Sequence, residues 1–241
     1  MAKRPDPGRC VHCLRQFHDL TWDHVFPASW YPDTTPAALE KWKVPACQRC
    51  NAEYGRIERD LLVRLGLCIP PEAAASAGIA KKVLRSLDPS AAKTDKDRKA
   101  RAADRARVIR ELIPFRKPPE EGVLPGLQPE FGTIYPDFAG VLIPSGSLER
   151  LGEKVARGIT FIRHGTLLGP EYTIRVYVAH DDKVAELREL LQTRGQLFER
   201  GPGISVFRAE LDVDPLTALY RMEIWSRIPL YAAVLNQDID R

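Results

Sequence analysis

Apolar residues recur at helical spacing through the first half of the chain. One helix is predicted to begin near Asn51 and to end at Gly66. Its apolar face consists of Ile57, Leu61, Leu62 and Leu65. A second helix is predicted over residues 72–87 and a third over residues 95–113, where almost no apolar residue precedes Val108. Because the third helix lacks an apolar face, we expect it to be exposed or to lie against an acidic surface.

The last hundred residues combine strand and helix patterns. Residues 172–178 alternate apolar and polar side chains, which predicts a half-buried strand. The other elements predicted there are a helix over 148–157 with Ser147 as its N-cap, a helix over 181–194 that Gly195 ends, and strands over 204–208 and 220–224. This mixture predicts an α+β unit.

Proline and glycine residues divide these patterns into separate units. Residues 1–66 form the first unit, residues 67–117 a helical basic segment, residues 118–136 a linker, and residues 137–241 the α+β unit. The predicted fold class of the whole chain is therefore α+β.

The composition is that of a globular protein, with 44% of the 241 residues hydrophobic. No apolar run approaches the ~20 residues that span a bilayer. The basic start is not followed by an apolar segment, so we expect a cytoplasmic protein without a membrane partner. Disulfides are rare in the cytosol, and the five cysteines are therefore expected to be metal ligands or free thiols.

Positive charge is concentrated in the middle of the chain, although the formal net charge is only +4. Residues 81–117 hold 13 Lys or Arg against five Asp or Glu, whereas residues 118–241 hold 13 against 18. A concentrated basic stretch indicates a polyanionic partner, and a solvated helix face is the alternative interpretation. If the partner is DNA, the residues expected to contact its phosphates are Lys96, Arg98, Lys99, Arg101 and Arg105.

Four of the cysteines form two matched pairs, Cys10-x2-Cys13 and Cys47-x2-Cys50. Each pair can hold one edge of a tetrahedron, and four thiolates suit Zn²⁺. Four thiolates leave no open coordination position, so such a zinc would be structural rather than catalytic. Cys68 has no partner in the pattern and is expected to be a small buried apolar residue.

The residues between and after these pairs stand in a specific order. The segment DHVFP occupies residues 23–27, and the second pair runs directly into Asn51 within CQRCN. Over about residues 9–62, this order resembles the HNH endonucleases, the zinc-stapled branch of the ββα-metal (His-Me finger) nucleases. The resemblance implies an N-terminal zinc-stapled ββα-metal finger, with DNA as its partner.

The resemblance also implies a role for each polar residue of the motif. His24 matches the general base, and a neutral imidazole can take a proton from water because its ordinary pKa is about 6.5. Asp23 and Asn51 match the ligands of a catalytic Mg²⁺ or Mn²⁺, which are hard cations that prefer oxygen donors. We therefore expect a metal-dependent HNH endonuclease that hydrolyses DNA phosphodiester bonds.

Several residues leave the function open. Trp42 stands where many HNH sequences have an Asn that braces the loop behind the base. The alternative is therefore a catalytically inactive, zinc-stapled nucleic-acid-binding or adaptor protein. Glu58 could orient the site or be solvated, and Arg49 and Arg56 could contact phosphate or only aid solubility. Residues 137–241 resemble no family, and could act as a sensor or form a homodimer.

Overall fold

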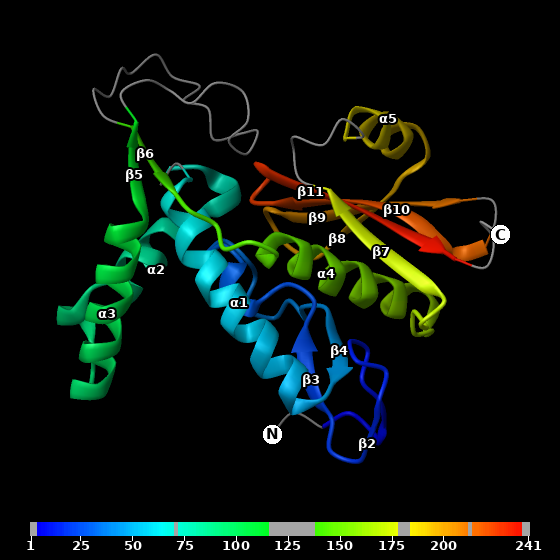
Figure 1. Ribbon diagram of the computed structural model, residues 1–241, viewed down its shortest axis with the longest axis horizontal. Helices are drawn as coiled ribbons and strands as arrows, with labels where there is room; N and C mark the ends of the chain where they lie inside the picture. Colours follow the sequence, from blue (N-terminus) through cyan, green and yellow to red (C-terminus); the bar gives the residue numbers. More distant parts are fainter. Residues whose placement is uncertain (1–3, 70–71, 116–137, 178–183, 212–213, 238–241) are drawn as a thin grey trace.

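The computed structural model describes residues 4–69, 72–115, 138–177, 184–211 and 214–237, which form a mixed α+β structure (Figure 1). The predicted linker over residues 118–136 lies outside these residues. No helix among them is both long and apolar enough to span a membrane.

The N-terminal finger consists of two short hairpins and one long helix. Its elements are β1 (Gly8–Arg9), β2 (Gln16–Phe17), β3 (Thr21–His24), a 3-10 turn (Ala28–Trp30), β4 (Lys43–Ala46) and α1 (Gln48–Leu67). Strands β1 and β2 pair antiparallel, as do β3 and β4, with Asp23 opposite Val44. Helix α1 begins three residues earlier than predicted because Cys47 is its N-cap, and the Cys47 sulfur accepts a hydrogen bond from the backbone N–H of Cys50.

The middle segment is helical, but the helix predicted over 72–87 is interrupted. The observed elements are a 3-10 turn (Ala74–Ser76), α2 (Ile79–Ser86), a 3-10 turn (Pro89–Ala91) and α3 (Asp95–Glu111). Gly78 separates the first two at a φ of +78°, and a Cβ at this position would collide with the carboxylate of Asp33. The prediction failed because the alanines favour helix, whereas Gly78 supplies a left-handed turn.

The helix predicted over 95–113 ends two residues early. Val108 is its buried residue, so the expectation of an exposed helix is confirmed. The residues that follow form β5 (Leu112–Phe115), which pairs antiparallel with β6 (Phe138–Val141). Strand pairing with a distant segment overrides the local helical pattern here, and it joins the middle segment to the C-terminal unit.

The C-terminal unit contains a five-stranded antiparallel sheet in the order β7-β11-β10-β9-β8. The strands are β7 (Tyr172–Tyr177), β8 (Gln196–Glu199), β9 (Ile204–Leu211), β10 (Asp214–Ile224) and β11 (Ile228–Asn236). Strands β8 and β11 were not predicted, and β9 and β10 are longer than expected. A tight turn at Trp225 and Ser226, both with positive φ, joins β10 to β11.

Two helices cover the two faces of this sheet, α4 (Ser147–His164) and α5 (Val184–Arg194). Helix α4 is longer than the predicted 148–157 and ends at Gly165, which has a φ of +66°. The prediction that Ser147 caps α4 was wrong, because the N-cap is Gly146 and no side chain accepts a capping hydrogen bond there. Helix α5 packs through Val184, Leu187 and Leu191 onto the opposite face.

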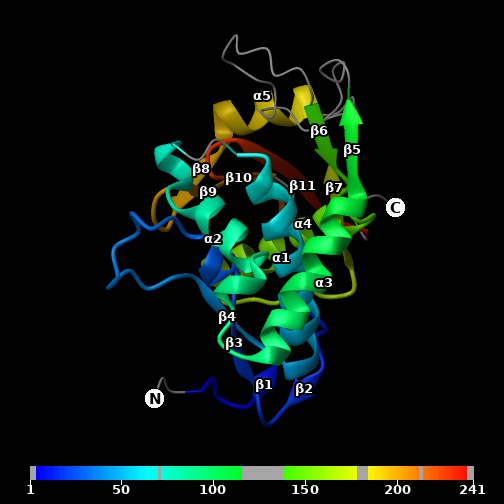
Figure 2. The same ribbon diagram turned by 90° about the vertical axis from the view of Figure 1, so that its left-hand side faces the viewer.

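Helix α4 lies between the sheet and the finger (Figures 1 and 2). Gly152 faces Val176 of the sheet, and Gly158 faces Val25 just after β3; a Cβ at either glycine would come within 3 Å of the valine side chain. One hydrophobic cluster accordingly contains residues of the finger, α4 and the sheet. The finger and the C-terminal unit therefore share a core, with α4 in its centre.

Candidate metal centre and the buried ion network beside it

The four paired cysteines come together at one end of the finger. Their sulfur atoms all lie within 4.8 Å of one another, and those of Cys13 and Cys47 are 3.9 Å apart. Among the described residues, this is the one group of three or more His, Cys, Asp or Glu side chains placed to hold a metal ion. Four thiols without a bond between them fit a tetrahedral ion such as zinc, as the sequence predicts.

Local backbone structure and packing bring the two pairs together. The first pair lies on the turn between β1 and β2, where Leu14 has a φ of +62° and the backbone N–H of Cys10 donates to the carbonyl of Arg15. The second pair lies at the junction between the end of β4 and the start of α1. Burial raises the pKa of the Cys50 thiol, and its cysteine neighbours raise it further. Deprotonation at such a crowded site needs a compensating cation, which a bound metal would supply.

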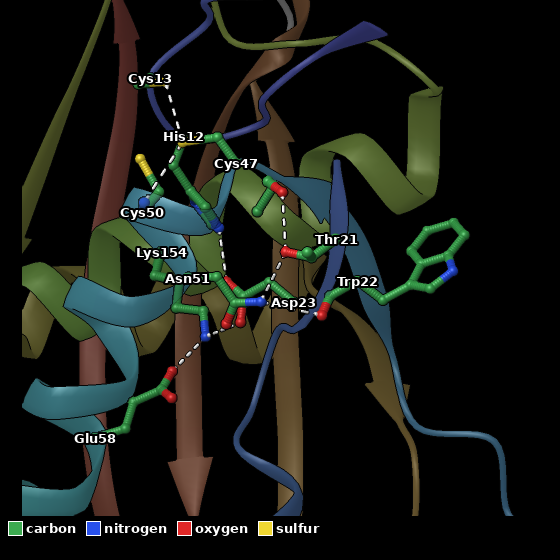
Figure 3. Close-up of polar contacts among 11 residues, drawn as sticks. His12, Cys13, Thr21, Trp22, Asp23, Cys47, Cys50, Asn51, Glu58 and Lys154 are labelled. Atoms are coloured by element: carbon green, nitrogen blue, oxygen red, sulfur yellow. Dashed lines mark hydrogen bonds and ion pairs between the residues drawn. The ribbon is translucent and has the colours of Figure 1, made fainter. Parts of the chain in front are cut away.

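Asn51 joins α1 to strand β3. Its side-chain nitrogen donates one hydrogen bond to the hydroxyl of Thr21 at 3.0 Å and another to the carbonyl of Trp22 at 3.2 Å (Figure 3). The sequence predicts that Asn51 lies near Asp23, and the structure attaches it to the two residues immediately before Asp23. Its amide group therefore fixes the position of β3 relative to the start of the helix.

Asp23 is buried, and both of its carboxylate oxygens have protein partners. Oδ2 lies 2.8 Å from Nε2 of His12, and Oδ1 lies 3.0 Å from Nζ of Lys154 (Figure 3). Lys154 is fully buried and also donates to Glu58. The lysine comes from α4, so the C-terminal unit supplies a cation to two carboxylates of the finger.

This network changes the interpretation of Glu58, which the sequence left as either orienting or solvated. Glu58 is 7% exposed, so it is a buried ion-pair partner rather than a solvated side chain. Burial raises the pKa of Glu58, while the adjacent Lys154 lowers it and Asp23 raises it. One ammonium group therefore compensates two carboxylates in a region from which water is nearly excluded.

Sequence reasoning did not identify Lys154 or His12 as members of this network. One signal for Lys154 was present: it lies three residues after Leu151 and one before Val155, both fully buried, on the apolar face of its helix. A lysine at such a position must find a carboxylate, since an unpaired charge is rarely buried. The identity of that carboxylate depends on contacts across the fold.

The network bears directly on the expected magnesium site. Asp23 and Asn51 have the oxygen atoms that Mg²⁺ prefers. In the described arrangement, however, the ammonium of Lys154 occupies the position beside Asp23 that a cation would take, and the amide nitrogen of Asn51 holds β3. These residues do not fit a divalent ion unless Lys154 first leaves Asp23.

His24 is half-buried and pairs with Lys43 across the β3–β4 hairpin. Burial lowers the pKa of His24, Asp23 raises it, and the lysines at 154, 41 and 43 lower it. The net effect is a pKa below the ordinary 6.5, so the imidazole is neutral at pH 7. A neutral imidazole can accept a proton from water, as a general base must.

Trp42 is 7% exposed and belongs to the shared core. Its backbone carbonyl accepts a hydrogen bond of 3.0 Å from the N–H of Val25, the residue after His24. Nearby, the indole of Trp30 donates to the carbonyl of Glu58, and the indole of Trp225 donates to the carbonyl of Trp30. The loop behind His24 is therefore held by backbone bonds and tryptophan packing, without the Asn that many HNH sequences have there.

Helix α3 carries the basic residues expected to contact phosphates, and some of them are already paired. Arg98 pairs with Asp95, and Arg101 pairs with Asp97 at 3.0 Å. The remaining three, Lys96, Lys99 and Arg105, are exposed. Intrahelical acids therefore offset part of the positive charge that makes this segment stand out in the sequence.

Comparison of the chain with protein-family models, with curated protein sequences and with solved structures finds no match. The function must therefore be argued from the chemistry of the site. The structure supplies three features for that argument: the thiol cluster, the neutral His24 and the buried ion network around Asp23.

Proposed function

We propose that this protein is an HNH-type endonuclease that hydrolyses DNA phosphodiester bonds. The observation that carries the proposal is the finger itself. A cluster of four thiols fixes the start of α1 beside the β3–β4 hairpin, and Asn51 is hydrogen-bonded to the strand that bears Asp23 and His24. This arrangement supports the proposal because it joins the segments on which the resemblance to HNH nucleases rests.

In this proposal His24 transfers the proton, and other residues of the chain hold it in position. His24 takes the proton from the attacking water, for which its lowered pKa keeps it in the neutral form. Asn51 and the zinc-bound cysteines hold the hairpin against α1, so that His24 keeps its position. A bound Mg²⁺ or Mn²⁺ would neutralise the charge that develops at the scissile phosphate.

The described arrangement keeps Asp23 away from solvent. Asp23 is 4% exposed and is paired with Lys154, which is not exposed at all. A substrate phosphate cannot approach Asp23 while α4 covers it. While Lys154 is paired with Asp23, these residues would not hold a divalent cation, and the proposal rests on His24 and on the placement of its strand.

The same observation favours a second candidate function, a zinc-stapled DNA-binding protein that does not cut. If Lys154 remains with Asp23 and Glu58 permanently, the carboxylates serve only to join α4 to the finger. Trp42 in place of the bracing Asn agrees with this candidate. The two candidates share the fold and the zinc, and they differ in whether phosphodiester bonds are broken.

The test is relaxation of supercoiled plasmid by the purified full-length protein in Mg²⁺ or Mn²⁺, with metal-free reactions alongside. The endonuclease proposal expects cleavage that His24→Ala abolishes and that His18→Ala, a change at an exposed histidine of the same finger, leaves intact. Zinc content and circular dichroism must be unchanged in both variants. DNA binding without cleavage in any divalent metal would reject hydrolysis and support the second candidate.

A further inference from the structure

Helix α1 presents a row of arginines to solvent. Arg49, Arg56 and Arg59 are all exposed, and they stand seven and three residues apart, which places them on one face of the helix. This face is distinct from the one that carries the buried residues of α1, among them Tyr54, Glu58 and Leu61. The row begins within one turn of Asn51, at the end of α1 that adjoins the thiol cluster.

These arginines have no ion-pair partner among the residues that the structure describes, and the acids of α1 show why. Glu53 pairs with Arg150 at 2.7 Å, and Glu58 pairs with Lys154. Asp60 pairs with Arg64 and Arg107. Each acidic residue of the helix is therefore paired with another cation, and the three arginines of the solvent face form no ion pair with a described residue.

The arginines surround a shallow hollow of about 510 Å³ whose other lining residues are Ala52 and Gly55. A Cβ built at Gly55 would meet nothing within 4 Å, so the space beside this residue is open, and the Arg59 side chain donates a hydrogen bond to the Gly55 carbonyl at 3.0 Å. Ala52 and Gly55 are small residues and form the floor of the hollow, while the three arginine side chains form its rim. We call these five residues the arginine groove.

We propose that the arginine groove binds the sugar–phosphate backbone of duplex DNA. From Arg49 to Arg59 the helix rises by roughly 15 Å, taking about 1.5 Å for each residue. One DNA strand carries a phosphate every ~3.4 Å along the duplex axis, so the row matches about four consecutive phosphates. Guanidinium groups suit this ligand because their planar donors can bind phosphate oxygens in pairs.

This inference rests on the proposed function in naming DNA as the partner, and it specifies which surface holds the substrate. The sequence assigns phosphate binding to α3 and leaves Arg49 and Arg56 open between phosphate contact and solubility; the groove places the contact at these two arginines together with Arg59. Arg98, Arg101 and Arg107 of α3 are paired with acids three or four residues before them, whereas Glu53, three residues before Arg56, is paired with Arg150 instead. Phosphates gain most from cations that have no competing carboxylate nearby.

The experiment measures binding of a fluorescent 20-base-pair duplex by anisotropy, in Ca²⁺ so that cleavage does not interfere, at several salt concentrations. The test variant is Arg49→Gln/Arg56→Gln/Arg59→Gln. The control variant is Lys96→Gln/Lys99→Gln/Arg105→Gln, which removes the same charge from the exposed basic residues of α3. All substituted residues are at or near the surface, and zinc content and circular dichroism verify that both variants fold.

The proposal expects the groove variant to lose at least tenfold in affinity. The slope of log K against log salt should also become shallower by about 2.7, since each neutralised phosphate contributes ~0.9. The α3 control should retain most of the wild-type affinity and most of the wild-type salt dependence. Wild-type binding by the groove variant, an equal loss in the control, or tighter binding of duplex RNA than of DNA would overturn the proposal. DNA binding by the wild type without cleavage in any divalent metal would reject hydrolysis and leave the groove proposal standing, so the two proposals fail separately.

Discussion

Replacing Lys154 with methionine tests the ion network most directly. Methionine has a similar length and is apolar, so the change removes the charge while leaving most of the volume. It leaves Glu58 buried with no cation and Asp23 with His12 alone. Removing one partner of a buried ion pair typically costs about 3–5 kcal/mol, because the other charge stays desolvated.

This loss is large relative to the total stability of a folded protein, which is roughly 5–15 kcal/mol. The measurement is urea denaturation followed by tryptophan fluorescence, since Trp30 and Trp225 are buried in the core that the network adjoins. Lys154→Met should lower the free energy of unfolding by about 3–5 kcal/mol. The double variant Lys154→Met/Glu58→Gln should recover part of the loss, because it removes one uncompensated carboxylate.

The pH dependence supplies an independent check. A carboxyl whose pKa is raised on folding contributes stability that is present at low pH and is lost as pH rises through the folded-state pKa. Burial raises the pKa of Glu58 even with Lys154 present, and loss of the lysine must raise it further. The deficit of Lys154→Met should therefore shrink as pH falls toward 4. A deficit below 1 kcal/mol at pH 7, or one that grows on acidification, would refute the reasoning.

Three further predictions concern the thiols and the glycines. Cys47→Ser should lose bound zinc and unfold the finger, whereas Cys68→Ser should retain the metal, as measured by elemental analysis and thermal unfolding. Cys68 is only partly buried, not buried as the sequence predicts, but its burial still raises the pKa of the thiol. Its alkylation by iodoacetamide should therefore be slower at pH 9 in the folded protein than in a free peptide, and equal rates would contradict this prediction. Gly158→Ala places a Cβ 2.7 Å from the Val25 side chain and should lower the free energy of unfolding by about 1–3 kcal/mol. Gly55→Ala has open space and should stabilise by roughly 0.5–1 kcal/mol, so equal effects of the two changes would contradict the packing.

The sequence predicts the four-cysteine cluster and helix α1 because much of the information for them is local. Each cysteine pair forms within a tight turn, and α1 follows directly from the second pair, so spacing alone indicates the cluster and the helix. The helix boundaries that failed were decided by distant contacts. Gly78 needs a left-handed turn against Asp33, and Leu112 joins a strand whose partner lies beyond residue 137.

The interior of the site could not be predicted for the same physical reason. Asp23 and Lys154 are 131 positions apart, and no periodicity relates them. The motif assigns Asp23 to a metal on the assumption that its carboxylate is free, and only the packing of α4 shows that the carboxylate has a lysine partner. The positive charge of α3 overstated its capacity to bind phosphate for a related reason. Counting the Lys and Arg residues of a segment does not show which of them are paired with neighbouring acids.

The central position of α4 has a consequence for the expression of truncated fragments. A fragment that stops before residue 138 would contain the complete thiol cluster and every residue of the motif, so the sequence alone would suggest that it folds. It would also expose Val25 and the apolar side of α1 to water, and it would leave two carboxylates without their lysine. Such a truncated finger should be obtained as an aggregated or unfolded product, and expression designs should keep residues 138–237 attached.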